Sequence, residues 1–456
     1  MHTDKKLICV NLRPICGYLL FFYNFLELCR IMEVMQKVFP YAAFLFLLLP
    51  LSCATTKNPV NAYISETSAT AGSTAVSPAK KSDIDSPTIT ITFAGDIMAH
   101  TYNHNITKYD KIWRDVKSYI EDSDLAFANL ESPVDQTKPV SSYPNFNLPL
   151  RYVEAAVDAG FDVFSLANNH SFDQFEKGIA NTIISMEELQ AKKATEGKEI
   201  YFSGLKKIKH GDYTFNIIEK NGWKILFLPV TGILNYPHDY AFINYVKTGE
   251  KSWREFIAYC RELRKAHPCD LFVISMHADE PEYKRTVTEK QRDFYLALLN
   301  EGMADVIWAN HAHIVKDREF IFDSTTGRQK MIMYANGNTI SAQRTQPKLT
   351  SEWPSDERDN TGDGLLEIVT FKKDKTKGGS SRYNESGENE NPVQIVKAEP
   401  VFITTYINTA WEFVLKPLNQ DFVNYLKEVK RKDWALYAGR RIKINEYYTK
   451  DLIKWQ

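Results

Sequence analysis

Short apolar segments alternate with amphipathic segments along most of the chain. The first is "TITITFAGDIM", in which alternating β-branched residues predict a strand that ends near Gly95 and Asp96. The same pattern predicts strands within 124–131, 161–167, 270–277, 304–310, 330–338 and 392–407. Helical periodicity predicts helices over 109–121, 151–160, 174–191, 253–266 and 288–301. Strands that alternate with helices in this way predict an α/β layered fold.

Two more regions complete this prediction. Residues 213–222 and 223–232 are typical of two strands joined at Asn221 and Gly222, a dipeptide that favours a tight hairpin turn. The polar, glycine-rich piece 372–391 predicts a mobile loop. Residues from Thr409 onward have basic and aromatic character, and they predict a helical addition at the C-terminus.

The N-terminal region has a different pattern, in which Lys37 precedes the apolar run 38–51, followed by Ser52 and Cys53. A run of about 14 residues is short for a membrane span and suits the core of a signal peptide. A small residue before a cysteine resembles a bacterial lipoprotein signal, although Pro50 departs from the usual pattern. We therefore expect lipidation of Cys53, and the alternatives are an ordinary cleaved signal or an uncleaved anchor.

The segments on either side of this signal are left out of the predicted core. Met32 and Met35 are alternative start sites, so residues 1–31 depend on start-site choice and carry no weight in the fold prediction. Residues 54–87 are rich in Ser, Thr and Ala and too poor in large apolar residues to fold, which predicts a flexible tether. We expect an exported, membrane-anchored lipoprotein that faces the periplasm or the cell exterior.

Charge and cysteine content narrow the classes of function. The 456 residues include 56 Lys and Arg against 57 Asp and Glu, and no basic run stands out. Nucleic acid is therefore not an expected partner, because phosphate backbones call for a basic surface. Cys260 and Cys269 are the cysteines of the expected mature body, and their spacing leaves open a disulfide or two buried thiols.

Residues with metal-binding chemistry follow five of the predicted strands. The carboxyl ends of the strands in an open α/β sheet converge on one crevice, so these side chains are expected to meet. They are Asp96, Asn129 and Glu131, Asn169 and His170, His277, and finally His311 and His313. A turn residue or a helix cap is the alternative for each of them taken singly.

Two pairs among these residues have a useful spacing. In an extended segment residues i and i+2 point the same way, so His311 and His313 are expected to face one spot, as are Asn129 and Glu131. The set combines carboxylate, imidazole and amide oxygen without thiolate. These donors favour Mn, Fe or Zn at a catalytic site over a closed structural zinc site.

The order of the motifs resembles a known family. "GDIM", "NLE", "ANNHSFD", a lone "MH", "HAH" and "YANGN" follow one another as in the CapA family of poly-γ-glutamate capsule proteins, which is similar in fold to the calcineurin-like metallophosphoesterases. The resemblance covers about 88–406 and implies a layered sandwich of two β-sheets flanked by helices. It leaves 407–456 as a C-terminal helical extension, after the signal segment 1–53 and the tether 54–87.

The resemblance also implies roles for individual residues, with one or two divalent ions as cofactor. It implies one metal held by Asp96 and His313, a bridging carboxylate from Glu131, and a second metal held by Asn169, His277 and His311. His170 would be the general acid, and Asp173 would accept its ring N–H and hold its orientation. For Asp173 the alternative is the N-cap of the following helix.

This chain departs from the phosphoesterase pattern at the first metal. A histidine usually stands two residues after the first aspartate, and here that position is Met98. His100 and His104 are candidates to replace it, although a surface position is expected for each. A single metal is therefore conceivable. Four cations are further candidates to meet an anionic substrate, with solvated surface charge as the expected alternative: Arg151, Lys316, Arg318 and Arg344.

The resemblance predicts a metal-dependent hydrolase that acts on, or helps to assemble, poly-γ-glutamate or a related envelope polymer. The bond cleaved would be a phosphoester or an amide. One alternative is a metallophosphoesterase of unknown substrate, and another is a non-catalytic assembly or export factor that keeps the fold, which Met98 favours. The expected partners are an anionic polymer or small envelope substrate, the membrane through the lipid anchor, and other capsule-assembly proteins.

Overall fold

The computed structural model describes residues 88–236, 239–278, 280–349, 357–374 and 383–449. The predicted signal, the lipidated Cys53 and the tether lie outside the described residues, as does part of the predicted loop 372–391. Within the described ranges, no helix has the length and apolar character needed to cross a membrane.

The larger of two sheets has eight strands. Its order is β14-β13-β12-β1-β2-β3-β4, with β11 paired to β1. The strands β1 to β4 pair in parallel, whereas β12, β13 and β14 continue the sheet in antiparallel fashion. The bounds are β1 (Thr88–Ile97), β2 (Leu125–Leu130), β3 (Val163–Ser165), β4 (Tyr201–Ser203), β11 (Asn338–Ile340), β12 (Asp363–Lys373), β13 (Val393–Ile407) and β14 (Phe413–Pro417).

The smaller sheet has six strands in the order β5-β6-β7-β8-β10-β9. Its four central strands are parallel, and β5 and β9 pair antiparallel at the edges. The β5–β6 hairpin turns at Asn221 and Gly222, both with positive φ as the dipeptide predicted. The bounds are β5 (Asn216–Lys220), β6 (Trp223–Thr231), β7 (Leu271–His277), β8 (Val306–Asn310), β9 (Arg318–Asp323) and β10 (Arg328–Met333).

The two sheets pack face to face around a buried apolar layer. The rings of Phe127 and Phe227, one from each sheet, lie 5.2 Å apart at an angle of 84°. Trp308 on β8 donates from Nε1 to the backbone oxygen of Ala94 on β1 at 2.7 Å. This hydrogen bond joins the strands of the two sheets just before the polar residues at their carboxyl ends.

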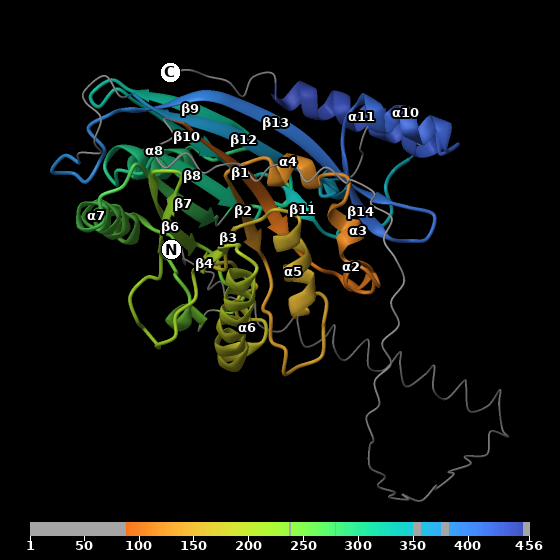
Figure 1. The fold of residues 1–456 in the computed structure, drawn as a ribbon, viewed down its shortest axis with the longest axis horizontal. Helices are drawn as coiled ribbons and strands as arrows, with labels where there is room; N and C mark the ends of the chain where they lie inside the picture. Colours follow the sequence, from red (N-terminus) through yellow and green to blue (C-terminus); the bar gives the residue numbers. More distant parts are fainter. Residues whose placement is uncertain (1–87, 237–238, 279, 350–356, 375–382, 450–456) are drawn as a thin grey trace, which may run out of the picture. The chain divides into compact units, whose positions relative to one another are not determined.

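Helices cover the outer faces of the sandwich (Figure 1). Helices α5 and α6 pack on the larger sheet, α7 and α8 pack on the smaller one, and α10 and α11 pack near β13 and β14. The bounds are α2 (Thr101–His104), α3 (Asp110–Trp113), α4 (Lys117–Glu121), α5 (Leu150–Asp158), α6 (Phe175–Thr195), the 3-10 helix η1 (Asp239–Phe242), α7 (Glu250–Ala266), α8 (Glu289–Asn300), α9 (Glu357–Asn360), α10 (Gln420–Glu428) and α11 (Lys432–Thr449).

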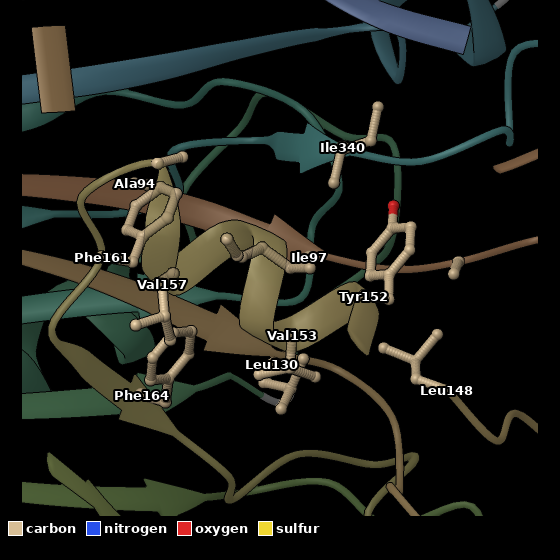
Figure 2. Close-up of a cluster of buried hydrophobic side chains, with 14 of the residues drawn as sticks. Ala94, Ile97, Leu130, Leu148, Tyr152, Val153, Val157, Phe161, Phe164 and Ile340 are labelled. Atoms are coloured by element: carbon tan, nitrogen blue, oxygen red, sulfur yellow. The ribbon is translucent and has the colours of Figure 1, made fainter. Parts of the chain in front are cut away.

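Helix α5 illustrates how apolar spacing fixes a helix on the sheet. Tyr152, Val153 and Val157 lie on one face and are fully buried. Figure 2 shows these side chains among residues of β1, β2 and β3, including Ile97. The helix is followed by Gly160 with φ 124°, where an added Cβ would meet the backbone of α4.

The α/β layered prediction with two sheets flanked by helices is therefore confirmed. Several details differ. The helix predicted over 109–121 is broken into α3 and α4, because Val116 takes φ −115° and ψ −6° between them. Residues after Thr409 begin with strand β14, and the helices follow it. Strands β4 and β9 had not been predicted. Cys260 and Cys269 are two buried free thiols, which decides against the disulfide.

Candidate metal centre

The predicted ligands come from both sheets, at the carboxyl ends of five strands. Asp96 lies in β1, Glu131 directly follows β2, and Asn169 follows β3 in the larger sheet. His277 ends β7, and His311 and His313 follow β8 in the smaller sheet. All six side chains are buried. The prediction placed them at the crevice of one open sheet, and that placement was wrong. The six side chains instead meet where the strands of the two packed sheets end side by side.

Glu131 lies at the middle of this cluster. Its Oε1 is 3.8 Å from Nε2 of His277 and 3.7 Å from Nε2 of His313. Asp96 Oδ2 is 3.1 Å from Nδ1 of His313. Asn129 Nδ2 donates to Asp96 Oδ1 at 2.8 Å and lies 3.4 Å from Glu131 Oε2, so Asn129 and Glu131 face the same way as their spacing predicted.

The second half of the cluster joins the loop after β3 to the end of β7. Asn169 Oδ1 lies 2.8 Å from Nε2 of His277. The ring centroid of His277 lies 4.9 Å from that of His311. An amide oxygen and two imidazoles therefore meet here without a lysine or arginine among them, a donor set suited to a divalent transition metal.

His311 and His313 approach the cluster through a strained turn. Their φ angles are 94° and 56°, in the left-handed region that non-glycine residues rarely adopt. The expectation of an extended segment was therefore wrong, although both rings do reach the cluster, with centroids 5.9 Å apart. Backbone strain of this kind costs about 1–3 kcal/mol per residue and is concentrated at functional sites.

Unpartnered buried atoms test whether a metal fits. Glu131 Oε1, His311 Nδ1 and Asn129 Oδ1 are buried and have no hydrogen-bond partner among the described residues. Leaving such an atom unsatisfied costs about 1–3 kcal/mol, so three of them in one cluster call for a further partner. The free atoms of the carboxylate and the imidazole are metal-ligand atoms, and a divalent ion fits both.

The pKa shifts within the cluster also favour a bound cation. Burial, and next the charge of Asp96, raise the pKa of Glu131 well above its usual range. Burial, and next the neighbouring histidines, lower the pKa of His277 well below its usual range and that of His311 to about 4. The imidazoles are thus neutral, as metal ligation requires, and a cation between the carboxylates would relieve their repulsion.

Two overlapping groups of residues have ligand atoms close enough to hold an ion. Glu131, His311 and His313 form one group, and Asp96, Glu131 and His277 form the other, with the ligand atoms of each group within 4.8 Å of one another. Glu131 belongs to both, which agrees with a bridging role. The division differs from the one implied by the resemblance, which paired Asp96 with His313 and placed His277 with His311.

His170 and Asp173 form a separate pair beside the ligands. His170 Nδ1 lies 2.7 Å from Asp173 Oδ2, and both side chains are buried. The same carboxylate oxygen accepts a hydrogen bond from the backbone N–H of Phe146 at 2.8 Å, and the Phe146 ring contacts the His170 ring edge-on. Asp173 thus orients the His170 ring, and helix α6 begins after Asp173, with Gln174 at its N-cap.

Sequence reasoning missed other residues around the cluster. Asn235 accepts a hydrogen bond from Asn169 Nδ2 at 3.0 Å, and its own Nδ2 lies 3.3 Å from His170 Nδ1. Asn338 Oδ1 lies 3.1 Å from His313 Nδ1. Burial acts to raise the pKa of Glu282, but the charge of His313, a hydrogen bond with Tyr283 and the charges of His311 and His170 together lower it. Only Asn338, in the motif "YANGN", had a signal in the sequence.

The histidines near Met98 are half-buried. Met98 is 1 % exposed and brings no ligand nitrogen to the cluster. His100 is half-buried, accepts a hydrogen bond at Nδ1 from the backbone N–H of Ala342, and packs edge-on against Phe146. Burial, and next the charge of His313, lower the pKa of His100 to about 3. His104 is also half-buried. A surface position was expected for both histidines, and both are partly exposed.

The four cations considered for an anionic substrate have structural partners. Lys316, Arg318 and Arg344 are buried, so their expected place on the solvated surface was wrong. They pair with Glu280, Glu367 and Asp363, respectively. Arg151 is exposed and lies over the ring of Tyr109 at 5.3 Å. The structure therefore brings none of the four to the ligands as a free positive charge.

Comparison with known proteins shows the family. The profile described as "Bacterial capsule synthesis protein PGA_cap" matches residues 90–343. The chain belongs to this family. Every residue of the metal-ligand cluster lies inside the matched range, whereas α10 and α11 lie beyond it. The resemblance to the CapA family inferred from the motif order is thereby confirmed.

The individual relatives have low sequence identity to this PGA_cap chain. The capsule biosynthesis protein CapA of Bacillus anthracis is 28% identical over 311 residues, which cover 65% of this chain and 69% of the relative. A hypothetical protein from Thermus thermophilus has a TM-score of 0.35 and 15% identity, covering 69% of this chain and 98% of its own. The protein TT1561, also from Thermus thermophilus, has a TM-score of 0.32 and 9% identity, covering 62% of this chain and 97% of its own.

Proposed function

We propose that this member of the PGA_cap family is an exported, metal-dependent hydrolase of capsule or related envelope polymer metabolism. The observation that carries the proposal is the buried cluster around Glu131, with unpartnered carboxylate and imidazole atoms. Its relative in Bacillus anthracis is a capsule biosynthesis protein, which supports the polymer as the setting. Export and attachment to the membrane through Cys53 belong to the proposal and rest on the N-terminal sequence.

The residues that would hold the metal are the six of the cluster. Glu131 would be shared between two ions or would ligate one, and the other five would complete the set: Asp96, Asn169, His277, His311 and His313. A divalent metal in such a site supplies Lewis acidity and a water whose pKa is lowered toward neutrality. The donors suit Mn, Fe or Zn.

In this proposal His170 supplies the proton to the leaving group, and Asp173 orients its ring. Asp173 accepts the Nδ1–H of His170 at 2.7 Å, so the second proton of the imidazolium is carried at Nε2. That proton is the one transferred to the leaving oxygen or nitrogen. The buried carboxylate of Asp173 stabilises the protonated ring and fixes its orientation, as in other histidine–carboxylate pairs.

A non-catalytic assembly factor is the second candidate function. Met98 favours it, because a buried thioether stands where metallophosphoesterases usually place a histidine ligand. Such a factor would keep the fold and a partial ligand set. It would bind its polymer or its partners without cleaving a bond.

Hydrolysis assays with purified protein test the proposal. Wild-type protein loaded with Mn, Fe or Zn would be incubated with p-nitrophenyl phosphate, bis-p-nitrophenyl phosphate and γ-glutamyl p-nitroanilide. We expect metal-dependent turnover of at least one of these classes, and its loss in Glu131→Gln. His267→Ala is the matched histidine control, because His267 is outside the cluster and packs on Phe215. Absence of turnover with metal bound would favour the assembly factor.

A further inference from the structure

A short segment connects the smaller sheet to a loop of the larger one beside the cluster. Residues 232–236 directly follow β6, and we call them the crossing segment. At its start, the N–H of Gly232 donates to the backbone oxygen of His277 at 2.8 Å. At its end, the hydroxyl of Tyr236 donates to Oδ1 of Asn145 at 2.9 Å, in the loop that precedes α5. Hydrogen bonds therefore fix the crossing segment at both ends.

Asn235 in the crossing segment contacts two residues of the site. Its Oδ1 accepts a hydrogen bond from Nδ2 of Asn169 at 3.0 Å, and its Nδ2 lies 3.3 Å from Nδ1 of His170. Asn169 and His170 are buried, whereas Asn235 is exposed. One exposed side chain therefore lies against both a proposed metal ligand and the proposed general acid.

The hydrogen bond to Asn235 decides which atom of Asn169 faces the cluster. The oxygen and the nitrogen of a side-chain amide are similar in size, so packing alone does not distinguish the two orientations. With Nδ2 of Asn169 bonded to Asn235, its Oδ1 lies 2.8 Å from Nε2 of His277. In the opposite orientation the NH2 group would face His277. That group donates hydrogen bonds and offers a metal ion no lone pair.

Asn129 has the other orientation within the same cluster. Its Nδ2 donates to Oδ1 of Asp96 at 2.8 Å, and its Oδ1 has no hydrogen-bond partner among the described residues. An amide here can thus present its nitrogen to the cluster when an acceptor lies inside the cluster. For Asn169 the acceptor of the nitrogen is Asn235, which lies outside the cluster, and the oxygen is the atom that faces inward.

We propose that Asn235 is a positioning residue that holds the amide oxygen of Asn169 toward the divalent metal, an inference that rests on the proposed function. This role needs only an acceptor atom on the side chain of residue 235. Asn235→Asp keeps an acceptor for Nδ2 of Asn169, whereas Asn235→Leu, which is similar in size, removes it. The two substitutions are therefore expected to have different effects on metal binding.

Titration of the metal-free full chain with Mn²⁺ or Zn²⁺ measures this effect as a dissociation constant, without reference to turnover. Asn235→Leu should weaken binding about 10-fold, the lower end of the range for residues that orient metal ligands. Asn235→Asp should bind at least as tightly as the wild type. Tyr236→Phe is the matched control, because it removes the other side-chain hydrogen bond of the crossing segment and keeps Asn235. Wild-type affinity in Asn235→Leu, or an equal loss in Tyr236→Phe, would overturn the inference.

Asn169→Asp provides a background in which the orientation of the ligand no longer matters. Both terminal atoms of a carboxylate are oxygens, and either can ligate the metal. In that background Asn235→Leu should change the metal dissociation constant by about 2-fold or less. A loss as large as in the wild-type background would show that Asn235 acts in some way other than by orienting Asn169.

NMR of the metal-free protein separates this inference from the proposed function. The Nδ2 signal of Asn169, labelled with ¹⁵N-asparagine, is identified by its absence in Asn169→Asp. Its hydrogens should exchange with solvent at least about 3-fold faster in Asn235→Leu than in the wild type and Asn235→Asp. This pattern in a wild type that binds no metal would contradict the proposed function and support the orienting role. Equal exchange in all three proteins would overturn the orienting role whatever the metal content.

Discussion

Asn169 Oδ1 lies 2.8 Å from His277 Nε2, which brings a loop of the larger sheet into contact with the last residue of a strand in the smaller sheet. A second hydrogen bond fixes the orientation of the Asn169 amide, because Asn169 Nδ2 donates to Asn235. The amide oxygen is therefore turned toward the cluster and not toward solvent. The proposed metal centre thus depends on the packing of two sheets, and any change that shifts one sheet against the other should affect it.

His170→Ala should separate proton transfer from metal binding. His170 is paired with Asp173 and is not among the groups of ligand atoms that could hold an ion. We expect the variant to keep its metal content and to lose about 10²- to 10⁴-fold in turnover, the usual contribution of a positioned acid. Steady-state kinetics with paired substrates checks this. The loss should shrink for nitrophenyl substrates, whose leaving group needs no proton, and an equal loss for all leaving groups would contradict the assignment.

Gly95→Ala should disturb the fold and the cluster together. An added Cβ at Gly95 would lie 1.9 Å from the backbone oxygen of Gly337, which accepts a hydrogen bond from the N–H of Asp96. We expect a loss of about 1–3 kcal/mol in the free energy of unfolding, together with weaker metal binding. Gly439→Ala in α11 is the control, because nothing lies within 4 Å of its added Cβ. That change should stabilise the helix by about 0.5–1 kcal/mol. Denaturant unfolding in which Gly95→Ala matches the wild type would contradict the prediction.

His311 should make the metal-free protein sensitive to acid. Its pKa is lowered to about 4 in the folded state, whereas an unfolded histidine titrates near 6.5. The unfolded state therefore binds this proton first, so stability is full above pH 6.5, falls as the pH drops toward 4, and is constant below. The difference corresponds to about 3 kcal/mol for the one residue.

Denaturant unfolding of chelated protein between pH 7 and pH 4 measures this effect. His311→Gln should show a shallower decline than the wild type over the same range. An identical slope in the two proteins would show that His311 is not held neutral by burial.

Cys53→Ala tests the proposed anchor. The apolar run 38–51 ends just before Cys53, and a segment poor in large apolar residues follows it. We expect the variant to be released from membranes or to remain unprocessed. Fractionation of cells followed by mass determination of the N-terminus would show this. A variant that is processed and sediments with membranes like the wild type would contradict lipidation at Cys53.

Much of the fold followed from local patterns. The parallel strands β2, β7 and β8 were readable as apolar runs, and the hairpin was readable at Asn221 and Gly222, because burial on both faces and turn chemistry leave strong local signals. The division into two sheets is not local. It depends on which strands pair, and no short-range pattern showed that β7 and β8 belong to a different sheet from β1.

The site was predicted less completely than the fold. His311 and His313 were named because histidines two residues apart after a buried strand are unusual, yet their left-handed backbone was not foreseen. Asn235 was missed because it stands in an irregular aromatic stretch and reaches Asn169 only through tertiary packing. Lys316 was expected at the surface, since sequence alone does not show that Glu280 accompanies it in the interior.

The metal content of protein purified without a histidine tag tests the central claim most directly. Plasma mass spectrometry of the wild type should find about one to two ions of Mn, Fe or Zn per chain. Glu131→Gln and Asn169→Ala should lose most of that metal, whereas His267→Ala should retain it, because His267 contacts Phe215 and not the cluster. A wild-type protein that stays free of metal after incubation with all three ions, or a Glu131→Gln variant with wild-type content, would contradict the claim that this cluster is a metal centre.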